Sequence, residues 1–169
     1  RLLIADDEPL VQIGVKSMLD RAGLSGLGIE ICGTASNGRE ALKLIEKHSP
    51  HIVITDIKMP IMDGLELMRQ CQQKYGRLPL FIVLTSYEEF HLAKEALSLH
   101  AIEYLVKFEL TGENLKASIH TALDILHEVT RSSQYQLQSV PAETLLFHER
   151  FFIMLLHNLF ENEEQFRLQ

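Results

Sequence analysis

Five short apolar runs, separated by segments with helical spacing, constrain the fold of this chain more than any other feature. The runs are LLIA (2–5), IEICGT (29–34), HIVIT (51–55), LFIVLT (80–85) and AIEYLV (101–106). Several are apolar almost throughout, which is typical of parallel strands covered on both faces and not of half-exposed strands. Their alternation with helices predicts an α/β fold, a doubly wound open parallel sheet with helices on both faces.

Three of the predicted helices carry start signals. Pro9 suits the first turn of a helix that would end near Gly23. Asn37 stands three residues before Glu40, as in a capping box, and Thr111 is a candidate N-cap of the last helix. These signals support five strand and helix pairs in strict alternation.

The character of the chain changes after about residue 130. The segment RSSQYQLQSVPAE (131–143) is polar and contains a proline, so it reads as a linker or a frayed helix end. We therefore expect one domain over residues 1–130, followed over residues 131–169 by a linker and an apolar helical extension.

This extension contains a dense apolar stretch, TLLFHERFFIMLLHNLF (144–160). His148, Glu149 and Arg150 interrupt it, which makes it too short and too polar to span a membrane. The consecutive apolar residues 151–156 cannot all share one face of a helix. We predict that residues 143–160 form a buried helix that mediates self-association or folds back on the chain. It would be either a linker toward an effector domain or a remnant of that missing domain.

Charge and composition narrow the class of protein. The net charge is −7 and no basic cluster occurs, so this chain is a poor candidate for binding nucleic acid by itself. Cys32 and Cys71 are far apart and lack metal spacing, which indicates buried thiols in a reducing compartment, the cytoplasm. His120 and His127 are about two helical turns apart, too far to share a metal, and we expect surface or packing roles for the histidines.

Polar residues follow four of the predicted strands. Asp6 and Asp7 follow the first, Asp56 the third, Thr85 closes the fourth and Lys107 follows the fifth. In an open parallel sheet, ligands bind outside the carboxyl ends of the strands. Three carboxylates in one small space need a divalent cation, and oxygen ligands with room for water and a phosphate suit Mg²⁺. With a hydroxyl and an ammonium beside them, they predict a site that holds a phosphoryl group.

The motifs ADDEP (5–9), TDIKMPIMDGLEL (55–67), IVLTSY (82–87) and AIEYLVK (101–107) occur in order at suitable spacing. Together they resemble the receiver domain of bacterial two-component response regulators, over roughly residues 2–127. The resemblance implies a flavodoxin-like sheet with strand order 2-1-3-4-5. The segments DDEPLVQIGVKSML and SNGREAL resemble the corresponding sequences of a subgroup that carries an AraC-type helix-turn-helix DNA-binding domain after the receiver. That domain is not in this chain.

The resemblance assigns the acidic residues. Asp56 matches the phosphoacceptor, and Asp6 and Asp7 match the acidic pair that binds Mg²⁺, one of them directly and the other through water. The backbone carbonyl of Lys58, two residues after Asp56, would complete the protein ligands.

The resemblance also assigns a switch. Thr85 matches the hydroxyl that moves to bond the phosphoryl group, Lys107 the lysine that pairs with it, and Tyr104 the aromatic residue that rotates into the space left by Thr85. Receivers typically have proline after this lysine, with a cis bond, whereas this chain has Phe108. A cis bond before a non-proline residue costs about 2.5–4 kcal/mol. We therefore expect a trans bond, with the Phe108 ring packed at the start of the final helix or on a partner surface.

The implied function is a phosphorylation-controlled signalling module and not an enzyme, apart from slow self-phosphorylation and self-dephosphorylation. A sensor histidine kinase would be the donor, and phosphorylation would promote homodimerisation and switch the attached DNA-binding domain, making the whole protein a transcription regulator. No membrane association is expected.

Two alternatives stay open at this point. One is a Mg²⁺-dependent phosphatase with an aspartyl-phosphate intermediate, although such hydrolases usually carry a second Asp where this chain has Lys58. The other is a degenerate receiver that only binds partners, against which the complete acidic set argues.

Overall fold

The computed structural model describes residues 1–23, 26, 28–86 and 90–135. Two compact units make up the chain, Arg1–Glu128 and Val129–Gln169, and the first contains the sheet. The predicted helix over residues 143–160 lies outside the described residues. The division into a domain over 1–130 and an extension over 131–169 stays a prediction.

The sheet has five strands that pair in parallel in the order β2-β1-β3-β4-β5, which confirms the predicted fold class. Their bounds are β1 Leu2–Ala5, β2 Ile31–Ala35, β3 Ile52–Asp56, β4 Leu80–Thr85 and β5 Ala101–Val106. The three central strands β1, β3 and β4 are buried at every position. Burial on both faces explains why their sequences are nearly uninterrupted apolar runs.

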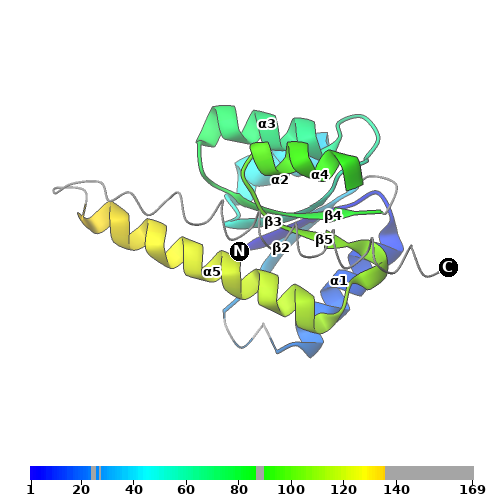
Figure 1. Cartoon of the computed structure of the whole chain (residues 1–169), viewed down its shortest axis with the longest axis horizontal. Helices are drawn as coiled ribbons and strands as arrows, with labels where there is room; N and C mark the ends of the chain where they lie inside the picture. Colours follow the sequence, from blue (N-terminus) through cyan, green and yellow to red (C-terminus); the bar gives the residue numbers. More distant parts are fainter. Residues whose placement is uncertain (24–25, 27, 87–89, 136–169) are drawn as a thin grey trace, which may run out of the picture. The chain divides into compact units, whose positions relative to one another are not determined.

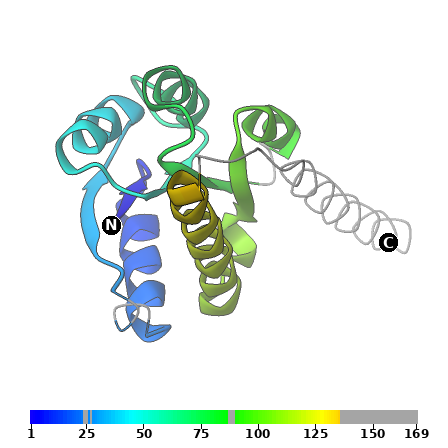
Figure 2. The same ribbon diagram turned by 90° about the vertical axis from the view of Figure 1, so that its left-hand side faces the viewer.

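In the described residues, four α-helices connect the strands, a fifth follows β5, and together they cover the sheet. Their bounds are α1 Pro9–Arg21, α2 Gly38–His48, α3 Gly64–Tyr75, α4 Phe90–Ser98 and α5 Gly112–Tyr135. Helices α2, α3 and α4 lie on one face, and α1 and α5 lie on the other (Figure 1). Figure 2 shows the same two layers after a quarter turn, with the sheet between them.

Each face of the sheet has its own apolar core. On one face α2, α3 and α4 pack against alternate strand residues such as Leu3 and Val53. On the other face α1 and α5 pack against their neighbours Ile4 and Ile54. Full burial of one such side chain contributes about 1.5–3 kcal/mol, so the two cores fix the strand register and the positions of the strand ends.

The predicted helix starts are present. Pro9 is the first residue of α1, and the side chain of Asn37 accepts a hydrogen bond from the Glu40 N–H at 2.9 Å. Thr111 Oγ1 accepts from the Asn114 N–H at 3.2 Å, and the Asn114 side chain accepts in return from the Thr111 N–H at 2.8 Å. These bonds satisfy N–H groups that a helix leaves without partners in its first turn. None of the helices in the described residues is long and apolar enough to cross a membrane.

Candidate functional site

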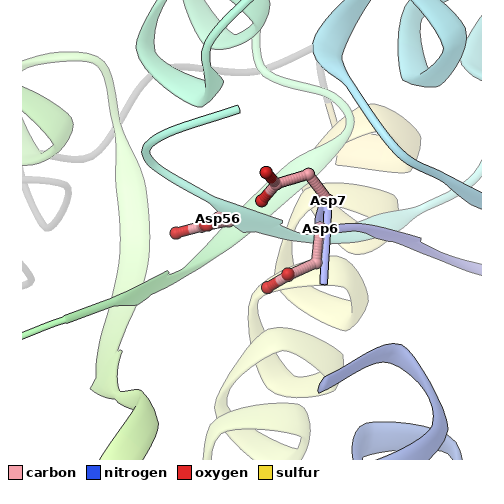
Figure 3. Close-up of side chains that lie close together, drawn as sticks. All are labelled: Asp6, Asp7 and Asp56. Carbon is pink, nitrogen blue, oxygen red and sulfur yellow. The ribbon is translucent and has the colours of Figure 1, made fainter. Parts of the chain in front are cut away.

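Three carboxylates meet at the carboxyl ends of β1 and β3. Asp6 and Asp7 follow β1 and Asp56 is the last residue of β3 (Figure 3). One oxygen from each lies within 4.8 Å of the others. Asp6 is 0% and Asp56 4% exposed, whereas Asp7 is exposed. The parallel register therefore brings together acids that are about 50 residues apart in sequence, as the motif spacing predicts.

Lys107 extends from the end of β5 into this acidic cluster. Its Nζ lies 2.8 Å from Asp56 Oδ2, 2.8 Å from Glu8 Oε1 and 3.0 Å from Asp6 Oδ2. Burial favours the neutral amine, but the hydrogen bonds to Asp56 and Glu8 outweigh burial and raise the pKa of the Lys107 ammonium. Lys107 is therefore a fixed positive charge beside Asp56.

Glu8 is a site residue to which the sequence analysis assigned no role. The adjacent acids Asp6, Asp7 and Glu8 were visible in the sequence, but a strand end followed by Pro9 gives no indication that Glu8 reaches Lys107, 99 residues away. The available signal was the charge itself, because adjacent acids repel one another and a nearby cation stabilises them.

Backbone groups orient the two buried carboxylates. The Ile57 N–H donates to Asp56 Oδ1 at 2.7 Å, and the Glu8 N–H donates to Asp6 Oδ1 at 2.8 Å. Burial raises the pKa of Asp6, although this backbone hydrogen bond and Lys107 act in the opposite direction. Asp6 thus lies where its negative charge is poorly hydrated and a cation would be favoured.

The carboxylate oxygens fit a hard divalent cation. Lys107 pairs with Asp6, Glu8 and Asp56, and Asp7 lies beside Asp6 and Asp56, so this cluster of four acids and one ammonium has an excess of negative charge. All these donors are oxygen atoms, which Mg²⁺ prefers as ligands. The Asp7 carboxylate is exposed to solvent, which would allow the ion to keep some of its water ligands. Asp6, Asp7 and Asp56 would hold the ion. The position of the Lys58 carbonyl relative to such an ion stays a prediction, and the Lys58 side chain is exposed.

Thr85 and Tyr104 lie on neighbouring strands. Thr85 is the last residue of β4, is fully buried and donates through Oγ1 to the Ser86 carbonyl at 3.0 Å. Tyr104 of β5 is half-buried and pairs with Val83, two residues before Thr85. Because residues two apart on a strand share a face, Thr85 and Tyr104 are on the same side of the sheet. This placement is compatible with the predicted switch, whose motion stays a prediction.

The Lys107–Phe108 bond is trans, as predicted, since the cis bond in the described residues is Leu78–Pro79. Lys107 begins a short 3₁₀-helix, Lys107–Glu109, and still reaches Asp56. The Phe108 ring is 81% exposed. The prediction that it could be buried at the start of α5 is therefore wrong, because the 3₁₀ turn directs the ring to solvent. Contact with a partner surface stays a prediction.

Two glycines permit the close chain packing beside the site. A Cβ on Gly64, the first residue of α3, would lie 2.1 Å from the Asp56 carbonyl oxygen, and its N–H donates to the Ile57 carbonyl at 2.8 Å. A Cβ on Gly38 would lie 2.7 Å from the Met62 carbonyl oxygen. Both glycines stand at helix starts, so the sequence marks the helix boundary without revealing the backbone contact.

Comparison with known proteins agrees with this geometry. The model of the response regulator receiver domain family matches residues 2–120. The chain is 35% identical over 152 residues to the uncharacterized transcriptional regulatory protein YesN of Bacillus subtilis, covering 90% of this chain and 39% of that protein. It is 36% identical over 130 residues to the transcriptional regulatory protein PdtaR of Mycobacterium tuberculosis, covering 77% of this chain and 60% of that protein. The chain thus spans less than two thirds of the length of these relatives.

Solved structures show the same fold. The receiver domain of AraT, a response regulator from Geobacillus stearothermophilus, superposes with a TM-score of 0.67 at 33% identity, covering 75% of this chain and 95% of that one. The receiver domain of the putative response regulator NarL from Mycobacterium tuberculosis gives 0.62 at 29% identity, with 72% and 94% coverage. With its fold, its acidic cluster and these relatives, the chain belongs to the receiver domains of two-component response regulators.

Proposed function

We propose that this receiver accepts a phosphoryl group on Asp56 from the phosphohistidine of a sensor histidine kinase, in a reaction that requires Mg²⁺. The observation that carries the proposal is the buried Asp56 carboxylate, 2.8 Å from the Lys107 ammonium and clustered with Asp6 and Asp7. Such an arrangement supplies a nucleophile, a fixed positive charge and oxygen ligands for a cation in one place.

The transfer is an in-line substitution at phosphorus. An oxygen of Asp56 forms a bond to phosphorus while the bond from phosphorus to the histidine nitrogen breaks, and the imidazole leaves with the electron pair. Lys107 offsets negative charge on the transferring oxygens from its fixed position. Mg²⁺, when bound by Asp6, Asp7 and Asp56, supplies further neutralisation of those oxygens. The product is an acyl phosphate with about two negative charges.

Phosphorylation then acts on the packing between β4 and β5. Thr85 exchanges its bond to the Ser86 carbonyl for one to the phosphoryl group, and Tyr104 rotates into the vacated space. The surface formed by α4, β5 and α5 changes as a result, in a population shift between two packings of one fold.

The output is control of transcription. Relatives of this chain are named transcriptional regulatory proteins, and the chain spans only part of their length. A DNA-binding domain of the AraC-type helix-turn-helix class, outside this chain, would respond to the switch. The protein would form a homodimer on activation and act in the cytoplasm. The exposed Phe108 ring, next to Lys107, is the residue we expect to contact the kinase.

The alternatives have less support. An aspartyl-phosphate phosphatase usually carries a second Asp, as general acid, two residues after the nucleophile, and Lys58 at that position argues against efficient turnover. A receiver that only binds partners would have no use for two buried acids held against a lysine, which cost free energy to desolvate.

One incubation separates the three possibilities. The protein is mixed with Mg²⁺ and acetyl phosphate, and intact mass and released inorganic phosphate are followed together. A receiver gains one phosphoryl group that persists, whereas a phosphatase releases phosphate with rapid turnover. A binding module shows neither change, and that result would contradict the proposal.

Mg²⁺ should stabilise the fold through Asp7. A ligand that binds the native state alone, at about 100 times its Kd, raises the free energy of unfolding by about 2.7 kcal/mol. Thermal melts with and without Mg²⁺ should therefore differ in the wild type and much less in Asp7→Ala. Asp124→Ala, which removes an exposed acid from α5, is the matched control and should keep the full shift. Equal shifts in both variants would remove Asp7 from the site.

A further inference from the structure

Glu8 is a partner of Lys107 that the proposed chemistry does not use. The Lys107 ammonium has three carboxylate partners, at 2.8 Å for Glu8, 2.8 Å for Asp56 and 3.0 Å for Asp6. The ammonium donates hydrogen bonds to Glu8 and Asp56 and forms an ion pair with Asp6. A phosphoryl group on Asp56 must therefore share this single ammonium with the Glu8 and Asp6 carboxylates.

Exposure decides which carboxylate gives way. The side chains of Asp6 and Asp56 are 0% and 5% exposed, whereas that of Glu8 is 61% exposed. A buried carboxylate that loses its cation stays poorly hydrated, but an exposed one regains water at little cost. Glu8 is therefore the partner that releases Lys107 most readily.

The local backbone makes the Glu8 side chain available for this contact. Glu8 is the N-cap residue of α1, with extended φ −91° and ψ 107°, yet its side chain makes no capping hydrogen bond. Its own N–H is fixed to Asp6 Oδ1 at 2.8 Å. The backbone of Glu8 is thus hydrogen-bonded to Asp6, while the Glu8 carboxylate is directed to Lys107.

We propose that Glu8 is a positioning residue that holds the Lys107 ammonium beside Asp56 before phosphorylation and competes with the phosphoryl group for Lys107 afterwards. This inference rests on the proposed function, since it assigns regulation to the same site. Glu8 acts through Lys107 and sets how strongly the site retains an anion on Asp56. Replacing its carboxylate with a neutral group should increase that retention.

The test measures the affinity of the site for beryllofluoride, which coordinates a carboxylate oxygen in the tetrahedral shape of a phosphoryl group. Fluorine NMR distinguishes the bound from the free species. At saturating Mg²⁺ the Kd should fall about 1.5- to 5-fold in Glu8→Gln, the range expected when a partly exposed competing ion pair is removed. Mg²⁺ is titrated for each variant, because the Glu8 charge also attracts the cation.

Two variants serve as controls. Glu113→Gln removes the same charge from the exposed first turn of α5 and should leave the Kd unchanged. Glu8→Asp retains the charge and should lie nearer to the wild type than Glu8→Gln does. Thermal unfolding checks that each variant is folded. Competition for Lys107 can alter the Kd without any change in folding.

The outcomes separate this inference from the proposed function. If the wild type gains a phosphoryl group and binds beryllofluoride, but Glu8→Gln has the wild-type Kd or Glu113→Gln shifts it equally, the role of Glu8 is overturned and the proposed function stands. If the wild type neither gains a phosphoryl group nor binds beryllofluoride, both fall.

Discussion

Asp56→Asn should fold normally and gain no phosphoryl group from Mg²⁺ and acetyl phosphate. Asparagine matches the shape of Asp56, and its amide oxygen can still accept the Ile57 N–H that now bonds Oδ1 at 2.7 Å. It has no carboxylate oxygen to form an acyl phosphate, so the loss should be complete. Lys107 keeps Glu8 and Asp6 as partners, which limits the effect on folding.

Intact-mass measurement checks this result. Asp63→Asn is the matched control, since it makes the same change in the loop after Asp56, where Asp63 caps α3 through a 2.7 Å bond from the Glu66 N–H. Asparagine is as good an N-cap as aspartate, so this variant should be phosphorylated like the wild type. The same mass gain in Asp56→Asn as in the wild type would remove Asp56 from the role of acceptor.

Gly64→Ala should be among the most destabilising single-methyl additions in this domain. The new Cβ would lie 2.1 Å from the Asp56 carbonyl oxygen, and the obstacle is backbone, which cannot rotate away as a side chain could. Inserting a methyl group into such packing costs typically 1–3 kcal/mol, and a contact this short puts the expected loss of unfolding free energy at about 3 kcal/mol or more. The backbone would have to move to relieve this contact, and Asp56 would move with it, so phosphorylation should slow.

Urea unfolding with Gly14→Ala as the control measures this effect. Gly14 lies within α1 and has nothing within 4 Å of its Cβ position. Alanine there should stabilise the protein by up to about 1 kcal/mol, because glycine is the poorer helix former. The two substitutions should change the free energy of unfolding in opposite directions. A Gly64→Ala variant as stable as the wild type would show that the loop after β3 can move aside.

The sheet could be predicted from the sequence because its central strands are covered on both faces. β1, β3 and β4 contain nearly continuous short apolar runs, as buried parallel strands do, and each is bounded by a helix start or a polar strand end. The edge strand β2 was placed less accurately, beginning at Ile31 and not at residue 29. It is only half-buried, so its pattern is weaker.

The location of the candidate site followed from the same topology, but its internal contacts did not. Parallel strands bring their carboxyl ends to one edge, which is enough to group Asp6, Asp56 and Lys107. The Glu8–Lys107 pair and the Gly64–Asp56 approach depend on side-chain reach and loop path, which no periodicity encodes. The exposure of Phe108 likewise depends on a single 3₁₀ turn.

The long separation of Lys107 from its acidic partners has a consequence for cooperativity. Lys107 lies 99 residues from Glu8 and 51 from Asp56 along the chain. A partly folded form with β1 and β3 docked, but without β5, would hold the acids together with no ammonium among them, and their mutual repulsion would penalise it. The charge distribution thus disfavours incomplete sheets, so the domain should gain its ordered acidic edge only when its last strand is in place.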